Sequence, residues 1–245
     1  MKVAVLGATK GMGRALARLA AERGDELCVL GRNIADLERS AADLAVRGTD
    51  SRVAAVTCDL EKPEMFSAAI AEARESLGGL DAVIVTAAIF ATQEELESDP
   101  ELTERLLRIN FCNTVLFCEV AKKALLEEGG GTLCVFSSVA GERGRKPVII
   151  YGAAKAGLSQ YLEGLDHKHR SDGLHVVTVK PGFVKTSMTA GLEPPPFAGE
   201  PEQVAERVLS AIQRGAPVVY APAPWQLIMA VIRALPRTVM RRINF

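Results

Sequence analysis

The sequence predicts an α/β fold with a doubly wound parallel sheet of about seven strands and helices on both faces. Short aliphatic runs, typical of buried strands, alternate along the chain with longer segments of helical periodicity, which is the pattern of βαβ units. Hydrophobic residues make up 48% of the chain, but aromatic residues only 5%. A parallel sheet of aliphatic strands covered by helices has this composition.

The strand-like runs follow one another through most of the chain. The first runs from Lys2 to Leu6, and the others cover residues 26–30, 52–57, 80–86, 131–137, 174–180 and 216–220. A length of 245 residues without an evident linker suits one α/β core. We therefore expect a single domain over residues 1–245, in which residues 225–245 form a basic amphipathic extension.

A glycine-rich turn follows the first strand. It runs from Gly7 to Gly13 with the sequence GATKGMG, and a segment of helical periodicity follows it up to Gly24. Free N–H groups at a helix start and the helix dipole both favour an anion, so the turn predicts a site for a dinucleotide pyrophosphate. Its spacing differs from the commoner G-x-G-x-x-G, and an ordinary glycine-rich loop is the alternative.

Tyr151 and Lys155 stand four residues apart at the head of another helical segment. This spacing places the phenol and the ammonium on one face of a helix. A neighbouring cation stabilises phenolate and lowers the pKa of a tyrosine, which makes Tyr151 a candidate general acid or base. A solvated helix face is the alternative for this motif taken alone.

Together, the glycine turn and the Tyr-Lys motif resemble those of the short-chain dehydrogenase/reductase family, and the resemblance covers about residues 1–190. It implies a Rossmann-like sheet and four catalytic residues, namely Asn110, Ser138, Tyr151 and Lys155. Ser138 stands thirteen residues before Tyr151, as the family spacing requires, whereas the neighbouring Ser137 does not.

The resemblance also implies a cofactor site. Asp59 matches the aspartate that contacts the adenine amino group, and the segment PGFVKT from Pro181 to Thr186 matches the one that holds the nicotinamide amide. The chain departs from the family at residues 86–89, which read Thr-Ala-Ala-Ile where the family usually carries Asn-Asn-Ala-Gly or Asn-Ala-Gly, and this leaves open how tightly that loop packs. The expected cofactor-binding residues are Gly7, Thr9, Lys10, Gly11, Met12, Gly13, Arg32, Asp59, Leu60, Ala87, Ala88, Tyr151, Lys155, Pro181, Gly182, Val184 and Thr186.

The end of the second strand indicates which dinucleotide binds. NAD sites usually carry an acidic side chain there, but this chain has Gly31-Arg32-Asn33. The planar guanidinium of Arg32 can hold a phosphate with two donors, and Lys10 adds a second cation. Both positions mark NADPH preference in the family, so NADP is the expected cofactor; a surface charge is the alternative for Arg32.

These residues imply an NADPH-dependent carbonyl reductase. Ser138 and Tyr151 would polarise the carbonyl oxygen, and Tyr151 would donate the proton. Lys155 would lower the tyrosine pKa and hold the nicotinamide ribose, while Asn110 would position a water. The alternative is a dinucleotide-binding redox sensor or structural partner without turnover, a class that usually lacks one of the four residues.

The C-terminal segment is strongly basic. From Arg207 to Phe245 there are six arginines and no acidic residue, although the whole chain has a net charge of −1. Apolar residues recur at helical spacing from Trp225 onward, and arginines line another face. Such a helix either packs on its own or a neighbouring subunit, or lies on an anionic membrane surface. It is too short and too charged to span a membrane.

This tail loosely resembles that of bacterial reductases of polyprenyl-phosphate-linked ketosugars. The resemblance implies a hydrophobic, bulky or lipid-linked carbonyl substrate, and a β-ketoacyl group and a steroid-like ketone stay open as alternatives. The Pro-rich segment between Ala190 and Glu200 would form the substrate lid. The family resemblance also predicts a homo-oligomer.

Other classes of site find little support. The five cysteines form no Cys-x-x-Cys pair, and Cys28, Cys58 and Cys134 fall within or beside predicted strands, where small core residues belong. His167 and His169 diverge on a helix, so we expect no metal site, and no nucleic-acid partner. The N-terminus enters the first strand without a signal sequence, which predicts a cytoplasmic protein, peripheral on the inner membrane surface if the tail binds lipid.

Overall fold

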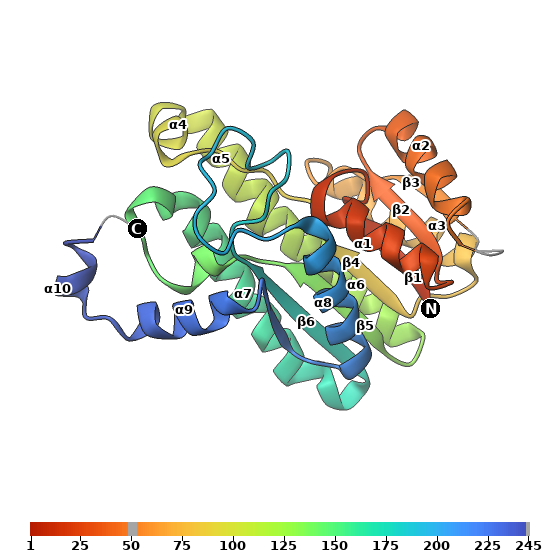
Figure 1. Cartoon of the computed structure of the whole chain (residues 1–245). Helices are drawn as coiled ribbons and strands as arrows, with labels where there is room; N and C mark the ends of the chain where they lie inside the picture. Colours follow the sequence, from red (N-terminus) through yellow and green to blue (C-terminus); the bar gives the residue numbers. More distant parts are fainter. Residues whose placement is uncertain (49–52, 244–245) are drawn as a thin grey trace.

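Seven parallel strands form one sheet in the order β3-β2-β1-β4-β5-β6-β7 (Figure 1). The computed structural model describes residues 1–48 and 53–243, so the first residue of the predicted run 52–57 lies outside the described residues. The doubly wound parallel sheet predicted from the sequence is confirmed. Its strands are β1 (Lys2–Leu6), β2 (Glu26–Gly31), β3 (Val53–Thr57), β4 (Ala82–Val85), β5 (Gly131–Phe136), β6 (Leu174–Pro181) and β7 (Val218–Ala221).

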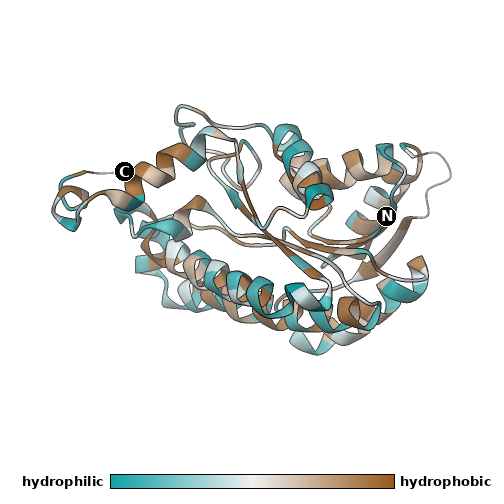
Figure 2. Ribbon diagram, turned by 90° about the horizontal axis from the view of Figure 1, so that it is seen from below, coloured by the Kyte–Doolittle hydropathy of each residue, from teal (hydrophilic) through white to brown (hydrophobic). Residues whose placement is uncertain are grey.

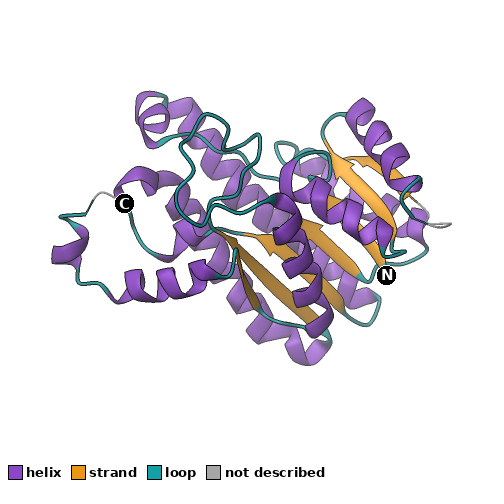
Figure 3. Cartoon of the chain, in the orientation of Figure 1, coloured by secondary structure: helices purple, strands orange, loops and turns teal. Residues whose placement is uncertain are grey.

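Long helices cover both faces of this sheet (Figure 3). One face packs against α1 (Gly11–Glu22), α2 (Ile34–Ala45) and α8 (Pro201–Arg214), and the other against α3 (Phe66–Leu77), α6 (Thr114–Glu127) and α7 (Ile149–His169). Successive strand residues point to opposite faces. In β1, Val3 and Val5 pack with the first group of helices, whereas Ala4 and Leu6 pack with the second.

The strands are therefore buried on both sides, and Figure 2 shows them as hydrophobic ribbons through the middle of the molecule. Cys28 and Cys134 lie within β2 and β5, and Cys58 directly follows β3; all three are buried, as predicted. Burial raises the pKa of the Cys28 and Cys58 thiols to about 12. These thiols are core residues and stay protonated at neutral pH.

Two short helices, α4 (Gln93–Ser98) and α5 (Pro100–Leu107), lie between β4 and α6. Local side chains start both of them. Thr92 and Glu95 form a reciprocal capping box at α4, and Asp99 accepts a hydrogen bond from the Leu102 N–H at α5. A π-helical turn, η2 (Arg108–Asn113), joins α5 to α6, and such turns are frequent at functional sites.

The chain ends in two helices, α9 (Pro224–Ala234) and α10 (Arg237–Met240), which extend from the side of the molecule opposite the N-terminus (Figure 1). We call residues 224–243 the C-terminal arm. The predicted extension also included Asn244 and Phe245, which lie outside the described residues. No helix in the described part of the chain has the length and apolar content needed to cross a bilayer.

One face of α9 packs against the rest of the chain. Its buried residues form a cluster with residues of β7 and of the 3₁₀ turn η3 (Val139–Glu142), and the members of this cluster are Val139, Tyr220, Trp225, Met229 and Ile232. Leu227 and Val231, on the same helix, are 73% and 56% exposed. The apolar pattern of the tail thus divides into a packed face and an exposed one.

Candidate active site

The glycine-rich turn opens a groove of about 430 Å³ at the carboxyl ends of the central strands. At the start of α1, Lys10 makes no side-chain capping bond and the first turn contains no acidic residue, so this helix start favours an anion. The groove is lined by twelve of the expected cofactor residues, namely Gly7, Thr9, Lys10, Gly11, Met12, Gly13, Arg32, Asp59, Leu60, Ala87, Ala88 and Thr186.

Close packing beneath the turn explains two of its glycines. Gly7 has a φ of +97°, which other residues rarely adopt. A Cβ at Gly13 would overlap the Gly7 carbonyl oxygen and Thr86 Oγ1. The Thr86 hydroxyl donates to the carbonyls of Leu6 and Gly7, at 3.0 and 3.1 Å. Thr86 therefore holds the turn tightly without the amide that the family usually carries here.

We expect Gly13→Ala to destabilise the protein by about 1–3 kcal/mol, the usual cost of overpacking, and to weaken dinucleotide binding because α1 must shift. Thermal unfolding and fluorescence titration with NADPH measure the two effects. The matched control is Gly164→Ala in α7, where a Cβ meets no atom within 4 Å among the described residues. A Gly13→Ala variant as stable as the control would contradict the packing described here.

Arg32 borders the groove where β2 ends. Its side chain is 63% exposed, and its Nη1 lies 3.8 Å from Glu61 Oε1. The Glu61 carboxylate is bound more closely by Arg105, at 2.6 Å, and the hydrogen bond from Arg105 is the main reason why its pKa is lowered. The exposed Arg32–Glu61 pair contributes little free energy, so an anion entering the groove can compete for Arg32.

The carboxylate of Asp59 accepts the Glu61 N–H at 3.0 Å, just after β3. The next residue, Leu60, is held through its carbonyl, which accepts a hydrogen bond of 2.6 Å from the buried Asn113 amide. These contacts set the wall of the groove expected to meet the adenine. Both residues line the groove; the contact of Asp59 with adenine and the role of Leu60 in cofactor binding stay predictions.

The four expected catalytic residues lie on three elements. Tyr151 and Lys155 occupy the first two turns of α7, Ser138 is the second residue after β5 and Asn110 lies in η2. The Ser138 hydroxyl lies beside the Tyr151 phenol. Lys155 is buried, its Nζ donates to the Phe136 carbonyl at 2.9 Å, and it lies 5.9 Å from the centre of the Tyr151 ring.

The titration of this pair differs from the sequence-based expectation. Burial raises the pKa of Tyr151 to about 12, although the hydrogen bond with Ser138 lowers it in part. Burial also lowers the pKa of Lys155 to about 8. The ammonium donates its hydrogen bond to the Phe136 carbonyl and lies over the Tyr151 ring at 5.9 Å, and desolvation dominates the pKa shifts of both groups. Tyr151 is therefore a neutral phenol at neutral pH, which is the form that can donate a proton.

The two neighbouring serines have different surroundings. Ser137 is buried, and its hydroxyl donates to the Lys155 carbonyl at 2.9 Å and lies 2.7 Å from Ser159 Oγ. Ser138 Oγ instead accepts the Ala140 N–H at 3.0 Å beside Tyr151. Ser137 thus joins β5 to α7, and Ser138 is the serine beside the Tyr151 phenol; its catalytic role stays a prediction.

The Asn110 side chain binds backbone. Its Nδ2 donates to the Ile89 carbonyl at 2.7 Å, and its Oδ1 accepts the Ile89 N–H at 2.9 Å. The same loop carries Phe90, whose ring meets the Tyr151 ring edge to face at 5.2 Å. Asn110 therefore holds the loop that lies between the groove and Tyr151, and its expected role toward a water stays a prediction.

Sequence reasoning missed Gln93. Its Oε1 accepts the N–H groups of Ile149 and Ile150, at 2.8 and 3.2 Å. The start of α7 has no side-chain cap from its own N-cap residue, Val148, so Gln93 supplies the missing acceptor from α4. The partners are 56 residues apart, and no local pattern marks such a contact.

The segment after β6 forms the far wall of the groove. Gly182 lies directly beneath the Trp225 indole, which leaves no room for a Cβ, and its N–H donates to the Ala221 carbonyl at 3.0 Å. Among the expected cofactor residues of this segment, Thr186 lines the groove, while Val184 is buried behind it and Pro181 ends β6.

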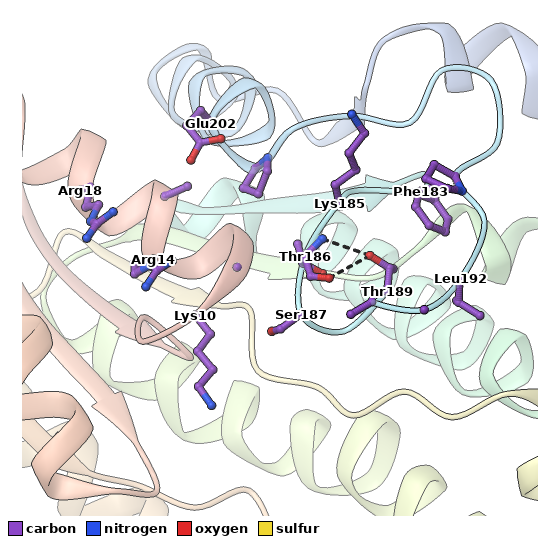
Figure 4. A pocket seen from close by; sticks show the side chains of 16 residues that line it. Lys10, Arg14, Arg18, Phe183, Lys185, Thr186, Ser187, Thr189, Leu192 and Glu202 are labelled. Atoms are coloured by element: carbon purple, nitrogen blue, oxygen red, sulfur yellow. Dashed lines mark hydrogen bonds between the residues drawn. The ribbon is translucent and has the colours of Figure 1, made fainter.

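A second cavity of about 720 Å³ adjoins the groove and shares with it Lys10, Gly11, Thr186 and Ser187. It lies between α1, the loop that follows β6 and the start of α8 (Figure 4). Ala190 to Leu192 and Pro194, from the expected lid, line it. In Figure 4 the Lys10 side chain points away from Lys185, whose ammonium binds Glu200 at 2.6 Å.

Comparisons with known proteins agree with this geometry. A family model described as short chain dehydrogenase matches residues 1–196. An uncharacterized oxidoreductase of Streptomyces coelicolor is 34% identical over 98% of this chain and 94% of its own length. Carbonyl reductase family member 4 of Xenopus laevis is 29% identical over 86% of this chain and 90% of its own length.

A similar solved structure is that of a short-chain type dehydrogenase/reductase from Mycobacterium ulcerans. It is 19% identical, covers 98% of this chain and 97% of its own, and superposes with a TM-score of 0.83. At this identity the likeness concerns the fold alone. An uncharacterized oxidoreductase of Mycobacterium tuberculosis is 30% identical over 98% of this chain and 96% of its own length, so the C-terminal arm falls within the matched region.

Proposed function

The chain belongs to the short-chain dehydrogenase/reductase family, and from this premise we propose that it is an NADPH-dependent reductase of a ketone or aldehyde on a hydrophobic, bulky or lipid-linked substrate. The observation that carries the proposal is the placement of the Ser138 hydroxyl beside the buried Tyr151 phenol, whose ring adjoins the groove through Phe90. The relatives named carbonyl reductases support the carbonyl substrate.

The groove fits a dinucleotide, and two cations support NADPH. The uncapped start of α1 suits the pyrophosphate. Lys10 and Arg32 both line the groove, and a 2′-phosphate there would gain charge-assisted hydrogen bonds. Glu61, the carboxylate nearest to Arg32, is paired with Arg105, so its repulsion of a phosphate is weakened.

When bound, the reduced nicotinamide supplies a hydride to the carbonyl carbon. Three side chains then have a role in the reduction. The Ser138 hydroxyl donates a hydrogen bond to the carbonyl oxygen and orients it, and the neutral Tyr151 phenol donates the proton that this oxygen takes up. Lys155, with a pKa near 8, places a positive charge next to the tyrosine that stabilises phenolate as it forms.

A direct experiment tests the function. The purified protein is incubated with NADPH and an extract of lipids and metabolites, and mass spectrometry searches for products that gain two hydrogens. A carbonyl reductase forms such products only with NADPH present. A protein that binds NADPH but forms none from any fraction would instead support the redox-sensor alternative.

The proposal of a lipid-linked substrate depends on the exposed face of the C-terminal arm. We propose that this face contacts an anionic membrane surface. Leu227 and Val231 project from α9 and are largely exposed. Arg237, Arg241 and Arg242 are exposed as well, and each arginine near an anionic bilayer contributes about 1 kcal/mol of attraction.

We also propose that the protein is cytoplasmic and forms a homo-oligomer. Light scattering would measure the oligomeric state.

Replacing Arg237, Arg241 and Arg242 by glutamine should weaken binding to vesicles of anionic phospholipid on the order of 10²-fold, because about 3 kcal/mol of attraction is lost. Sedimentation with vesicles at low salt measures this, and high salt should release the native protein by screening. The control replaces Arg39, Arg74 and Arg108, partly or largely exposed arginines of other elements. If native protein stays in solution at low salt, the arm has no membrane role.

A further inference from the structure

A buried carboxylate, that of Glu142, lies in the turn that follows Ser138. It does not belong to the four residues expected to be catalytic. The Glu142 side chain is 3% exposed, and its Oε1 accepts hydrogen bonds from Lys180 Nζ and from the Tyr220 hydroxyl, both at 2.7 Å. Arg233 Nη1 lies 3.7 Å from the same oxygen. These partners belong to β6, β7 and α9, so one carboxylate joins three elements.

Glu142 ends the short turn η3 that begins directly after Ser138. At the other end of the turn, Ser138 Oγ accepts the Ala140 N–H. The middle of the turn lies against α7, where a Cβ on Gly141 would be 2.6 Å from the Ala156 nitrogen. The position of Ser138 relative to Tyr151 therefore depends on how the far end of the turn is held.

The C-terminal arm reaches this turn at several points. The Arg143 guanidinium donates to the Leu235 carbonyl at 2.8 Å, and Val139 packs with the buried face of α9. Trp225 of the same helix covers Gly182 and donates through Nε1 to the Phe197 carbonyl at 3.3 Å. The arm thus contacts the serine turn, the Pro-Gly segment and the loop expected to form the lid.

The chemistry of this cluster favours a positioning role over a purely stabilising one. A buried ion pair is weak evidence for stability, because well-packed apolar residues often do as well. Four polar groups that meet at one point, however, allow only a narrow range of arrangements of the elements that carry them. Glu142 Oε2 has no hydrogen-bond partner within the described residues, so all of these contacts converge on Oε1.

We propose that Glu142 is a positioning residue of the reaction, which fixes the turn carrying Ser138 against the C-terminal arm. The arm is then part of the scaffold of the active site, whatever its outer face contacts. This inference rests on the proposed carbonyl reductase function, which gives Ser138 its role. Displacements of about 1 Å in such a group lower rates by up to 10²-fold.

The test is Glu142→Gln, which keeps the shape of the side chain and removes its charge. With NADPH and 9,10-phenanthrenequinone as the carbonyl probe, we expect kcat to fall about 10-fold to 10²-fold, while the Kd of NADPH changes less than twofold. In a Ser138→Ala background the same substitution should cost almost nothing more, because the turn then carries no hydroxyl to misplace. Independent, additive losses would overturn the positioning role.

The control is Glu119→Gln, since Glu119 also accepts a tyrosine hydroxyl, from Tyr161 at 2.7 Å, and binds a lysine, Lys122. This cluster lies on α6 and α7, away from Ser138, so its loss should leave kcat unchanged. Arg233→Gln should lower kcat in the same direction as Glu142→Gln but by less, and its matched control is Arg237→Gln on the same arm.

A second measurement does not depend on turnover. Hydrogen exchange of the free protein should rise in the peptide covering residues 138–142 in Glu142→Gln and stay unchanged in Glu119→Gln. Unchanged exchange in both would refute the positioning role even if activity fell. If Ser138→Ala and Tyr151→Phe leave reduction of the probe intact, the proposed function fails instead, and the exchange result alone then decides whether Glu142 holds the turn.

Discussion

Tyr151→Phe is expected to lower the turnover of a reduced carbonyl substrate by about 10²-fold or more, the usual range for loss of a general acid, and to leave NADPH affinity nearly unchanged. The substitution removes only the hydroxyl that lies beside Ser138. The ring keeps its edge contact with Phe90, and the groove is lined by other residues.

Steady-state rates of NADPH oxidation, together with fluorescence titration of NADPH, check this expectation. The matched control is Tyr161→Phe, which removes a tyrosine hydroxyl from the same helix where it bonds to Glu119 instead of Ser138. Wild-type turnover in Tyr151→Phe would show that another group supplies the proton, and the proposed mechanism would then be wrong.

The double variant Arg32→Asp with Lys10→Ala is expected to change the ratio of NADPH to NADH affinity toward NADH by at least about 10²-fold. Two charge-assisted hydrogen bonds to a 2′-phosphate, each contributing about 1.5–3 kcal/mol, are lost. The new carboxylate repels that phosphate and can accept the ribose 2′-hydroxyl of NAD instead. Glu61 stays paired with Arg105, so it does not compensate for the change.

Titration of both reduced cofactors by fluorescence gives the ratio. The control is Arg14→Asp, which makes the same change from arginine to aspartate as at Arg32. Arg14 lies one turn beyond Lys10 and lines the neighbouring cavity, not the groove. Its ratio should stay within about twofold of the native value, because Arg14 does not line the groove and so does not contact a phosphate bound there. A native protein that already binds NADH more tightly than NADPH would refute the assignment to NADP.

The sequence by itself determined the sheet and the place of the groove. Alternating aliphatic and helical runs specify βαβ units because side-chain periodicity is a local property, and each predicted strand lies within a few residues of an observed one. The turn from Gly7 to Gly13 was also predictable from a local pattern, because its glycines follow a strand directly and precede a helix. In the structure, Gly7 packs against the backbone of Ala87, just after β4. Helical spacing likewise predicted that Tyr151 and Lys155 share one face.

Only the tertiary structure decided the surroundings of those residues. Spacing does not reveal that Lys155 faces the Phe136 carbonyl or that burial raises the pKa of Tyr151, because desolvation depends on every element packed around a group. Periodicity could not tell a packed C-terminal helix from a surface one, since both bury an apolar stripe. The contact of Trp225 with Gly182 and the convergence of three elements on Glu142 join residues far apart in the chain, and only folding brings such partners together.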